Sequence, residues 1–268
     1  ALKSRGACAA VTPIEPAPRD GHLVASFAQE RMWVLDRIEH GNPFYNVSVA
    51  LRLVGRLDAA ALAQSLFELV ARHEALRTSF AVVDGRPMQV VHEAAKVELP
   101  IEAMAIEGDV DAAVSERAAR EAREAFDLER GPLLRTRLLR LGPDDHVLLF
   151  TMHHIVSDEW SRGVLIREVG ALYDAASRGA PHDLPALPVQ YVDYARWQRA
   201  FLAGDVQAEQ LAYWKKQLAG APRSLDLPSD RPRPKTPSFR GSRLPVTIDA
   251  DLTRAIKDLA RREGVTLY

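Results

Sequence analysis

The sequence has little of several things that would mark a specialised class of protein. It contains one cysteine, Cys8, among 268 residues, so no disulfide framework can form, and a reducing compartment such as the cytoplasm is the expected environment. No apolar run approaches the roughly 20 residues that a membrane-spanning helix needs. Lysine plus arginine total 35 and aspartate plus glutamate 36, giving a net charge of -1. Overall charge therefore attracts neither nucleic acid nor an anionic membrane, and partners must be recognised locally.

The composition is otherwise that of an ordinary globular chain. Hydrophobic residues make up 47% and charged residues 26%, close to the averages for folded domains. At roughly 150 residues per domain, the length allows one large or two smaller units with real cores. The sequence contains no phosphate-binding loop, no dinucleotide-binding glycine pattern and no Gly-x-Ser-x-Gly turn. Because Cys8 also has no base nearby, covalent nucleophilic catalysis has no candidate residue.

Helical and strand periods alternate along the chain. Apolar residues at helical spacing predict helices at residues 26–39, 58–73, 110–126, 159 onward, 191–202 and 206–218. Alternating apolar residues predict strands at residues 45–53, 78–83, 88–92, 133–139 and 147–152. Turn sequences beginning at Asp84 and Gly142 join four of these strands into two hairpins. Because hairpins are mixed with helices, the order predicts an α+β layered fold and argues against a doubly wound parallel sheet.

Changes in composition divide the chain into four parts. Residues 1–20 hold three prolines, lack a starting methionine and a secretory signal, and are interpreted as an interdomain linker within a longer polypeptide. Residues 21–180 carry the alternating helices and strands. Residues 181–240 form a connection with two helices followed by a proline-rich extended stretch. Residues 241–268 begin another unit, with an expected strand at 242–248 and then a helix.

One segment combines residue types that carry chemistry. His153 and His154 come at the end of an apolar strand, and Asp158 comes just before the next helix. Adjacent residues on a strand point to opposite faces, so at most one histidine enters a given cleft. Asp158 is placed to cap the helix, which brings its carboxylate back near the histidines. An imidazole beside a carboxylate suits proton transfer or the orienting of an attacking amine or hydroxyl.

Simpler interpretations of this segment stay open. In the first, both histidines are hydrogen-bonded locally and Asp158 only caps the helix. In the second, His154 and Asp158 are two ligands of a metal ion. A third ligand at a suitable spacing is not evident, so no metal is expected.

Four segments match, in order and spacing, the motifs of a known family. They are residues 26–33 (SFAQERMW), 72–80 (RHEALRTSF), 152–161 (MHHIVSDEWS) and 191–197 (YVDYARW). Together they resemble the condensation domains of nonribosomal peptide synthetases. The first segment looks most like the subtype that joins two L-configured residues (LCL). The resemblance covers essentially all of the chain after the linker, while the chain covers a little over half of the family domain.

The resemblance implies a particular architecture. The fold would be chloramphenicol-acetyltransferase-like, with two lobes that each pack helices on a mixed sheet, and a tunnel between the lobes. Residues 21–180 would be the N-terminal lobe, residues 181–240 the connection between the lobes, and residues 241–268 the truncated start of the second, similar lobe.

The resemblance also implies an acyltransferase-type enzyme that forms an amide. The amine of an acceptor aminoacyl thioester would attack the carbonyl of a donor thioester. Donor and acceptor peptidyl carrier proteins would deliver both substrates on phosphopantetheine arms, beside an adenylation domain in the same polypeptide. No cofactor or metal would be bound directly, and neither nucleic acid nor a membrane would take part. Two alternatives stay open, namely a stand-alone acyltransferase that uses coenzyme A and a non-catalytic module that docks carrier proteins.

Roles for single residues follow from the same resemblance. His154, His153 and Asp158 are the candidate catalytic residues, and His154, the second histidine, would orient or deprotonate the attacking amine. Asp158 would be structural and would pair with an arginine. Arg72 is the first candidate for that partner and Arg77 the second.

One position departs from the family pattern. Where the family usually has glycine after the aspartate, this chain has Glu159, followed by Trp160. A glutamate here would either crowd the tunnel or suit the positive end of the helix dipole. Trp197, from the fourth motif, would pack near the junction of the lobes.

Overall fold

The computed structural model describes residues 12–20, 23–105, 108–222, 224–225, 227–232 and 244–267. The chain divides into two compact units, Ala1–Ala221 and Pro222–Tyr268, which are described separately. Cys8 and the first part of the expected linker lie outside the described residues.

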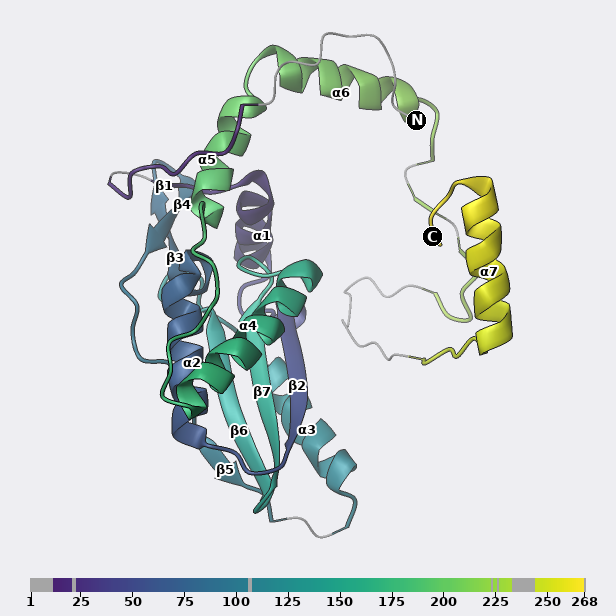
Figure 1. The fold of residues 1–268 in the computed structure, drawn as a ribbon. Helices are drawn as coiled ribbons and strands as arrows, with labels where there is room; N and C mark the ends of the chain where they lie inside the picture. The colour runs from purple at the N-terminus through teal and green to yellow at the C-terminus, as the bar shows by residue number, and fades with distance from the viewer. Residues whose placement is uncertain are drawn as a thin grey trace. The chain divides into compact units, whose positions relative to one another are not determined.

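The first unit contains two sheets (Figure 1). The larger has the strand order β2 (Asn46–Val54), β7 (Asp145–His153), β6 (Leu134–Gly142) and β5 (Ile101–Ala103). Its first three strands are antiparallel, whereas β5 runs parallel to β6. The smaller, antiparallel sheet has the order β1 (Leu23–Val24), β4 (Arg86–Val91) and β3 (Thr78–Val83). Both expected hairpins are present, as β3–β4 and β6–β7.

Helices cover both faces of the larger sheet. Helices α2 (Ala59–Arg72) and α4 (Glu159–Ser177) pack on one face, and α3 (Val110–Ala122) packs on the other (Figure 1). The remaining helices of this unit are α1 (Phe27–Ile38), α5 (Tyr191–Phe201) and α6 (Asp205–Gln217). Two short 3-10 helices, η1 (Pro43–Tyr45) and η2 (Glu74–Arg77), precede strands β2 and β3. The second unit contains helix α7 (Ala250–Glu263).

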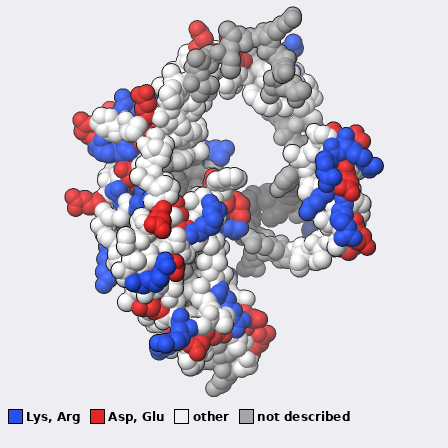
Figure 2. Space-filling view, viewed as in Figure 1, with Lys and Arg blue, Asp and Glu red and all other residues white. Residues whose placement is uncertain are grey.

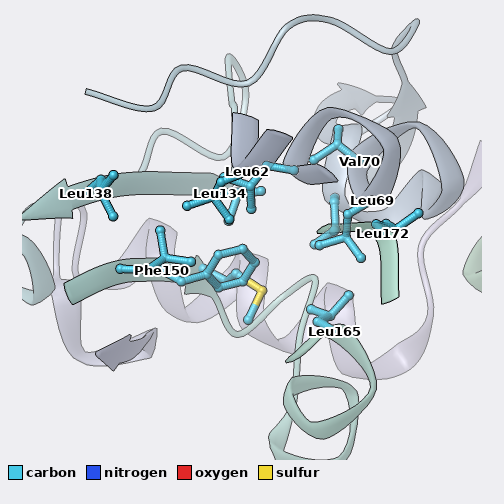
Figure 3. Close-up of a cluster of buried hydrophobic side chains, with 12 residues drawn as sticks. Leu62, Leu69, Val70, Leu134, Leu138, Phe150, Leu165 and Leu172 are labelled. Atoms are coloured by element: carbon cyan, nitrogen blue, oxygen red, sulfur yellow. The ribbon is translucent and has the colours of Figure 1, made fainter. Parts of the chain in front are cut away.

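Strand β7 is the centre of the core because side chains on both of its faces are buried. Leu148, Phe150 and Met152 face α2 and α4, while Val147 and Leu149 face α3. Figure 3 shows the first cluster, with labelled side chains Leu62, Leu69, Val70, Leu134, Leu138, Phe150, Leu165 and Leu172. A one-residue slip of β7 would exchange its two faces, so packing fixes the register. The residue at which the strand ends is thereby fixed as well.

The end of the expected linker is docked on α5. The backbone N–H of Ala17 and the guanidinium of Arg19 both donate to the carboxylate of Asp193, at 2.9 Å and 2.7 Å. The indole Nε1–H of Trp197 donates to the carbonyl oxygen of Thr12 at 2.7 Å. Burial alone would raise the pKa of Asp193, but the hydrogen bonds from Arg19 and from the backbone outweigh it and hold that pKa below its usual value. Residues 12–20 therefore follow a defined path.

The expected elements agree with the structure except in three places. Sequence reasoning missed the short strands β1 and β5 and the 3-10 helices η1 and η2. The helix expected to reach residue 126 ends at Ala122, where Arg123 caps it. The strand expected at 242–248 is wrong for residues 244–248, which form no strand, and residues 242–243 lie outside the described part. An apolar alternation makes a strand only where a neighbouring strand supplies hydrogen bonds, and within the described ranges residues 244–248 have none.

Charged side chains of both signs are interspersed on the face of the molecule shown in Figure 2. None of the helices in the described ranges is long and apolar enough to cross a membrane.

Candidate active site

The candidate site lies where β7 passes into α4. The strand ends at His153, residues 154–157 turn, and Asp158 caps the helix that begins at Glu159. The carboxylate of Asp158 accepts from the backbone N–H of Ser161 at 2.7 Å, and the hydroxyl of Ser161 accepts from the backbone N–H of Asp158 at 2.7 Å. This reciprocal cap holds the turn between two rigid elements.

His153 belongs to the core. Its side chain is buried, with the residue only 3% exposed, and its ring lies 6.2 Å from the rings of Tyr45 and Phe126. Its Nδ1 accepts the backbone N–H of Ile155 at 3.1 Å. Burial, and then the nearby charge of His154, lower the pKa of His153 to about 4. The ring is therefore neutral near pH 7 and has a structural role.

His154 is exposed and differently held. Its backbone N–H donates to the carbonyl of Tyr45 at 2.8 Å, which ties the turn to the start of β2. Its Nδ1 lies 2.7 Å from the carbonyl oxygen of Ser157. A carbonyl oxygen can only accept, so in the neutral ring Nδ1 carries the proton and Nε2 carries the lone pair. The turn thus presents Nε2 as a proton acceptor in a fixed orientation.

His154 lines a pocket of 250 Å³ between α1, the turn and α5. Other residues that line it are Gln29, Arg31, Met32, Asp158 and Tyr191. Three of the four sequence motifs meet at this pocket, because Gln29 and Tyr191 come from the first and the fourth. The hydroxyls of Ser26 and Tyr191 lie 3.0 Å apart and join α1 to α5.

Two residues of the second motif contact helix α4 through its residue Glu168. Arg72 Nε and His73 Nε2 both contact one carboxylate oxygen of Glu168 on α4, at 3.0 Å and 2.6 Å. These groups lie mostly out of solvent, with side chains 12% to 19% exposed. The arrangement anchors the helix whose first turn completes the site.

Comparison with known proteins assigns this arrangement to a family. The family model described as "Condensation domain" matches residues 19–268. The chain belongs to the condensation domain family. It is 44% identical to "Malpinin synthetase" of Mortierella alpina over 260 residues, which are 96% of this chain and 3% of that protein. It is 42% identical over its whole length to "Phosphinothricin tripeptide synthetase PhsC" of Streptomyces viridochromogenes, of which it covers 25%. The chain therefore spans only a small part of the curated relatives that it matches.

Solved structures agree with the fold of this condensation domain. The X-domain from teicoplanin biosynthesis is 32% identical with a TM-score of 0.82, over 95% of this chain and 56% of that chain. The same X-domain in a complex with OxyB gives 33% identity and a TM-score of 0.81, with the same coverage. The expected α+β, chloramphenicol-acetyltransferase-like fold is confirmed.

The expected arginine partner of Asp158 is wrong. Arg72 contacts Glu168, as described above, and donates to the carbonyl of Pro185. Arg77 donates to the carbonyl of His92 and lies 3.8 Å from Glu74. Both guanidiniums are thus engaged by other acceptors, whereas the carboxylate of Asp158 is engaged in capping α4. Within the described residues, the contact seen for the carboxylate of Asp158 is the cap of α4.

The glutamate that departs from the family pattern lies outside the pocket lining. Glu159 occupies the first turn of α4 and pairs with Arg162 one turn later. This placement favours the interpretation that the helix dipole accommodates Glu159. Trp160 is 84% exposed, and Trp197 lies on α5 stacked on Phe201 with ring centroids 5.0 Å apart.

A larger pocket of 510 Å³ beside β6 offers less chemistry. Its buried carboxylate, Glu121, is paired with Arg135 and Arg137. Burial would raise the pKa of Glu121, but these two arginines hold it below the usual value. Its histidine, His92, is hydrogen-bonded to Ser79. Across the described ranges, no group of three His, Cys, Asp or Glu residues could hold a metal ion.

Two parts of the site escaped the sequence reasoning. The carbonyl of Ser157 belongs to the main chain, so residue identity carries no signal for it. Tyr191 opens the fourth motif, and its place in that motif was the available signal. Only the fold brings its side chain to the pocket that His154 lines.

Proposed function

We propose that this chain forms peptide bonds between carrier-bound substrates, as an amide-forming acyltransferase of a nonribosomal peptide synthetase. The observation that carries the proposal is the 2.7 Å contact between His154 Nδ1 and the carbonyl oxygen of Ser157. It leaves Nε2 as the acceptor of a ring that lines the 250 Å³ pocket. An amine that enters the pocket finds a fixed acceptor for one of its protons.

The proposed reaction joins an amine to a thioester. The amine nitrogen attacks the donor carbonyl carbon, so a C–N bond forms and the carbonyl π electrons move to oxygen. When the tetrahedral intermediate collapses, the C–S bond breaks and sulfur leaves. His154 Nε2 takes the proton released by the amine, and that proton ends on the leaving sulfur as a thiol. Holding both reactants in place supplies much of the rate acceleration, because the loss of their translational and rotational entropy occurs on binding and not in the chemical step.

The partners of this reaction would be two peptidyl carrier proteins, donor and acceptor, with substrates on phosphopantetheine arms and an adenylation domain in the same polypeptide. The similarity to a tripeptide synthetase supports such an assembly. The first motif supports a preference for two L-configured residues. The presence of all four motifs favours this function over a stand-alone acyltransferase that uses coenzyme A.

The test is detection of the product on its carrier. The chain, extended at its C-terminus to a complete condensation domain, is mixed with loaded donor and acceptor carrier proteins. Intact mass then reports the dipeptidyl acceptor. We expect His154→Ala to lower the rate at least about 100-fold, because general-base groups contribute factors of that size. His182→Ala, at another exposed histidine, is the matched control and should keep the rate. Equal rates for both variants would refute the role of His154, and absence of product from the parent would refute the proposal.

A second candidate function is a docking module without catalysis. The observation in its favour is the similarity to an X-domain that was solved in complex with OxyB. In that case the extended parent would make no dipeptide, and its binding to carrier proteins would survive His154→Ala. Glu159→Gly separates a disabled enzyme from a docking module, because recovery of product in that variant would identify Glu159 as the cause of the inactivity.

A further inference from the structure

Tyr191 lies at the site without a role in the proposed reaction. It is the first residue of α5, its side chain lines the same pocket as His154, and the residue is 37% exposed. Its hydroxyl oxygen is 3.0 Å from the hydroxyl of Ser26, the residue that caps α1. The direction of that hydrogen bond decides what Tyr191 can do.

The hydrogen atoms can be assigned by counting donors and acceptors. Ser26 is fully buried, at 0% exposure, and its hydroxyl oxygen accepts the backbone N–H of Gln29 at 3.2 Å. Within the described ranges, the only acceptor near its own hydroxyl hydrogen is the oxygen of Tyr191. A buried hydroxyl seldom leaves its hydrogen unpaired. Ser26 therefore donates to Tyr191, and the phenolic hydrogen of Tyr191 is free to point into the pocket.

The surroundings keep that phenol protonated. Burial is the largest influence and raises the pKa of Tyr191, and the electrostatic effects of Tyr194 and then of Asp158 raise it further. The hydrogen bond from Ser26 acts in the opposite direction but is outweighed. The same pocket is thus lined by a hydrogen-bond donor, Tyr191, and by the ring of His154, whose Nε2 is an acceptor.

We propose that Tyr191 donates a hydrogen bond to the carbonyl oxygen of the donor thioester and stabilises the negative charge that develops there during attack. This inference rests on the proposed function. Tyr191 transfers no proton, since the oxyanion gives its electrons back when the C–S bond breaks. His154 receives the proton of the amine, and Tyr191 stabilises the charge on oxygen. The two groups thereby act on the two partners of one addition step.

The test compares two tyrosines on one helix. Tyr191→Phe removes only the hydroxyl at the pocket, and Tyr194→Phe removes a hydroxyl that accepts from Gln198 and does not line the pocket. In the extended condensation domain, we expect Tyr191→Phe to lower kcat by about 100-fold, at the lower end of the range seen for the loss of one oxyanion donor. The KM for the acceptor should stay close to the parent value, whereas the Tm should fall modestly because the buried hydroxyl of Ser26 loses its acceptor. Equal kcat for the two variants would overturn the proposal.

A second measurement decides the matter if Tyr191→Phe folds poorly. A fluorinated tyrosine at position 191 keeps the shape but ionises at lower pH. Because an ionised phenolate cannot donate, we expect the alkaline fall of kcat to move to lower pH, and an unmoved profile would overturn the proposal. The proposed function is judged separately: absence of dipeptide from the extended parent refutes that function, and an active His154→Ala variant refutes the role of His154. Unaffected tyrosine variants refute only this inference.

Discussion

The last residue of β7 and the first residue of the turn that follows it are both histidines, but their surroundings differ sharply. At the strand end, His153 is buried among aromatic rings and its pKa is lowered to about 4. In the turn, His154 is exposed, and one ring nitrogen is fixed by the carbonyl of Ser157. A reactive imidazole thus needs both a solvent-accessible edge and a fixed orientation. His154 has both because the buried strand ends at His153, the residue before it.

The largest expected effect is a difference in stability between variants of the two histidines. We expect His153→Ala to lower the free energy of unfolding by about 4 kcal/mol, since it leaves a cavity beside Tyr45 and Phe126 and an unpaired N–H at Ile155. His154→Ala should cost less than about 1 kcal/mol, as is usual for an exposed side chain. Urea unfolding of the two variants measures the difference, and similar losses for both would remove the distinction between core and turn.

The next largest effect is the pH dependence of stability that comes from His153 at the strand end. The pKa of His153 is about 4 in the folded chain and 6.5 in the unfolded one. As the pH falls below 6.5, the unfolded chain takes up a proton that the folded chain refuses until about pH 4, so the folded state loses stability. Above pH 6.5 this loss is absent.

Between pH 6.5 and pH 4, we expect a loss of up to about 3 kcal/mol from this group. His153→Gln keeps an acceptor for Ile155 but cannot titrate, so it should lack this part of the pH dependence. Unfolding of the parent and the variant at a series of pH values gives the comparison. Parallel curves would show that burial does not depress the pKa of His153.

The smallest effect concerns the cap that closes the turn. Asp158→Ala should lower the free energy of unfolding by about 1 kcal/mol, because the N–H of Ser161 loses its acceptor. Asp158→Asn supplies an equally good cap without the charge, so stability and product formation in the extended domain should both be kept. If Asp158→Asn instead loses activity as Asp158→Ala does, the charge of Asp158 matters and the capping role is insufficient.

Much of the fold could be predicted from the sequence because the apolar residues of the core recur at helical or strand spacing. The apolar run at 147–152 predicted β7, and the histidines at its end predicted where chemistry would be found. Strand β5 escaped because three residues carry too short a pattern, and its parallel pairing with β6 depends on the whole sheet.

The details of the site were less accessible for a physical reason. The cap by Asp158 follows from local sequence and was foreseen. The contact of Arg72 with Glu168 depends on how α2 packs across α4, which spacing along the chain does not encode. The proton on His154 Nδ1 depends on a main-chain carbonyl, which every residue has.

The docking of residues 12–20 on α5 shortens any tether ahead of this chain. For a carrier or other domain joined upstream, the free part of the connection would end at Thr12 instead of at Asp20. The contacts of Trp197 and Asp193 hold the intervening residues. Eight residues of extended chain correspond to about 28 Å of reach. Helix α5 would therefore limit how far any domain joined upstream could travel, and its first residue, Tyr191, lines the candidate pocket.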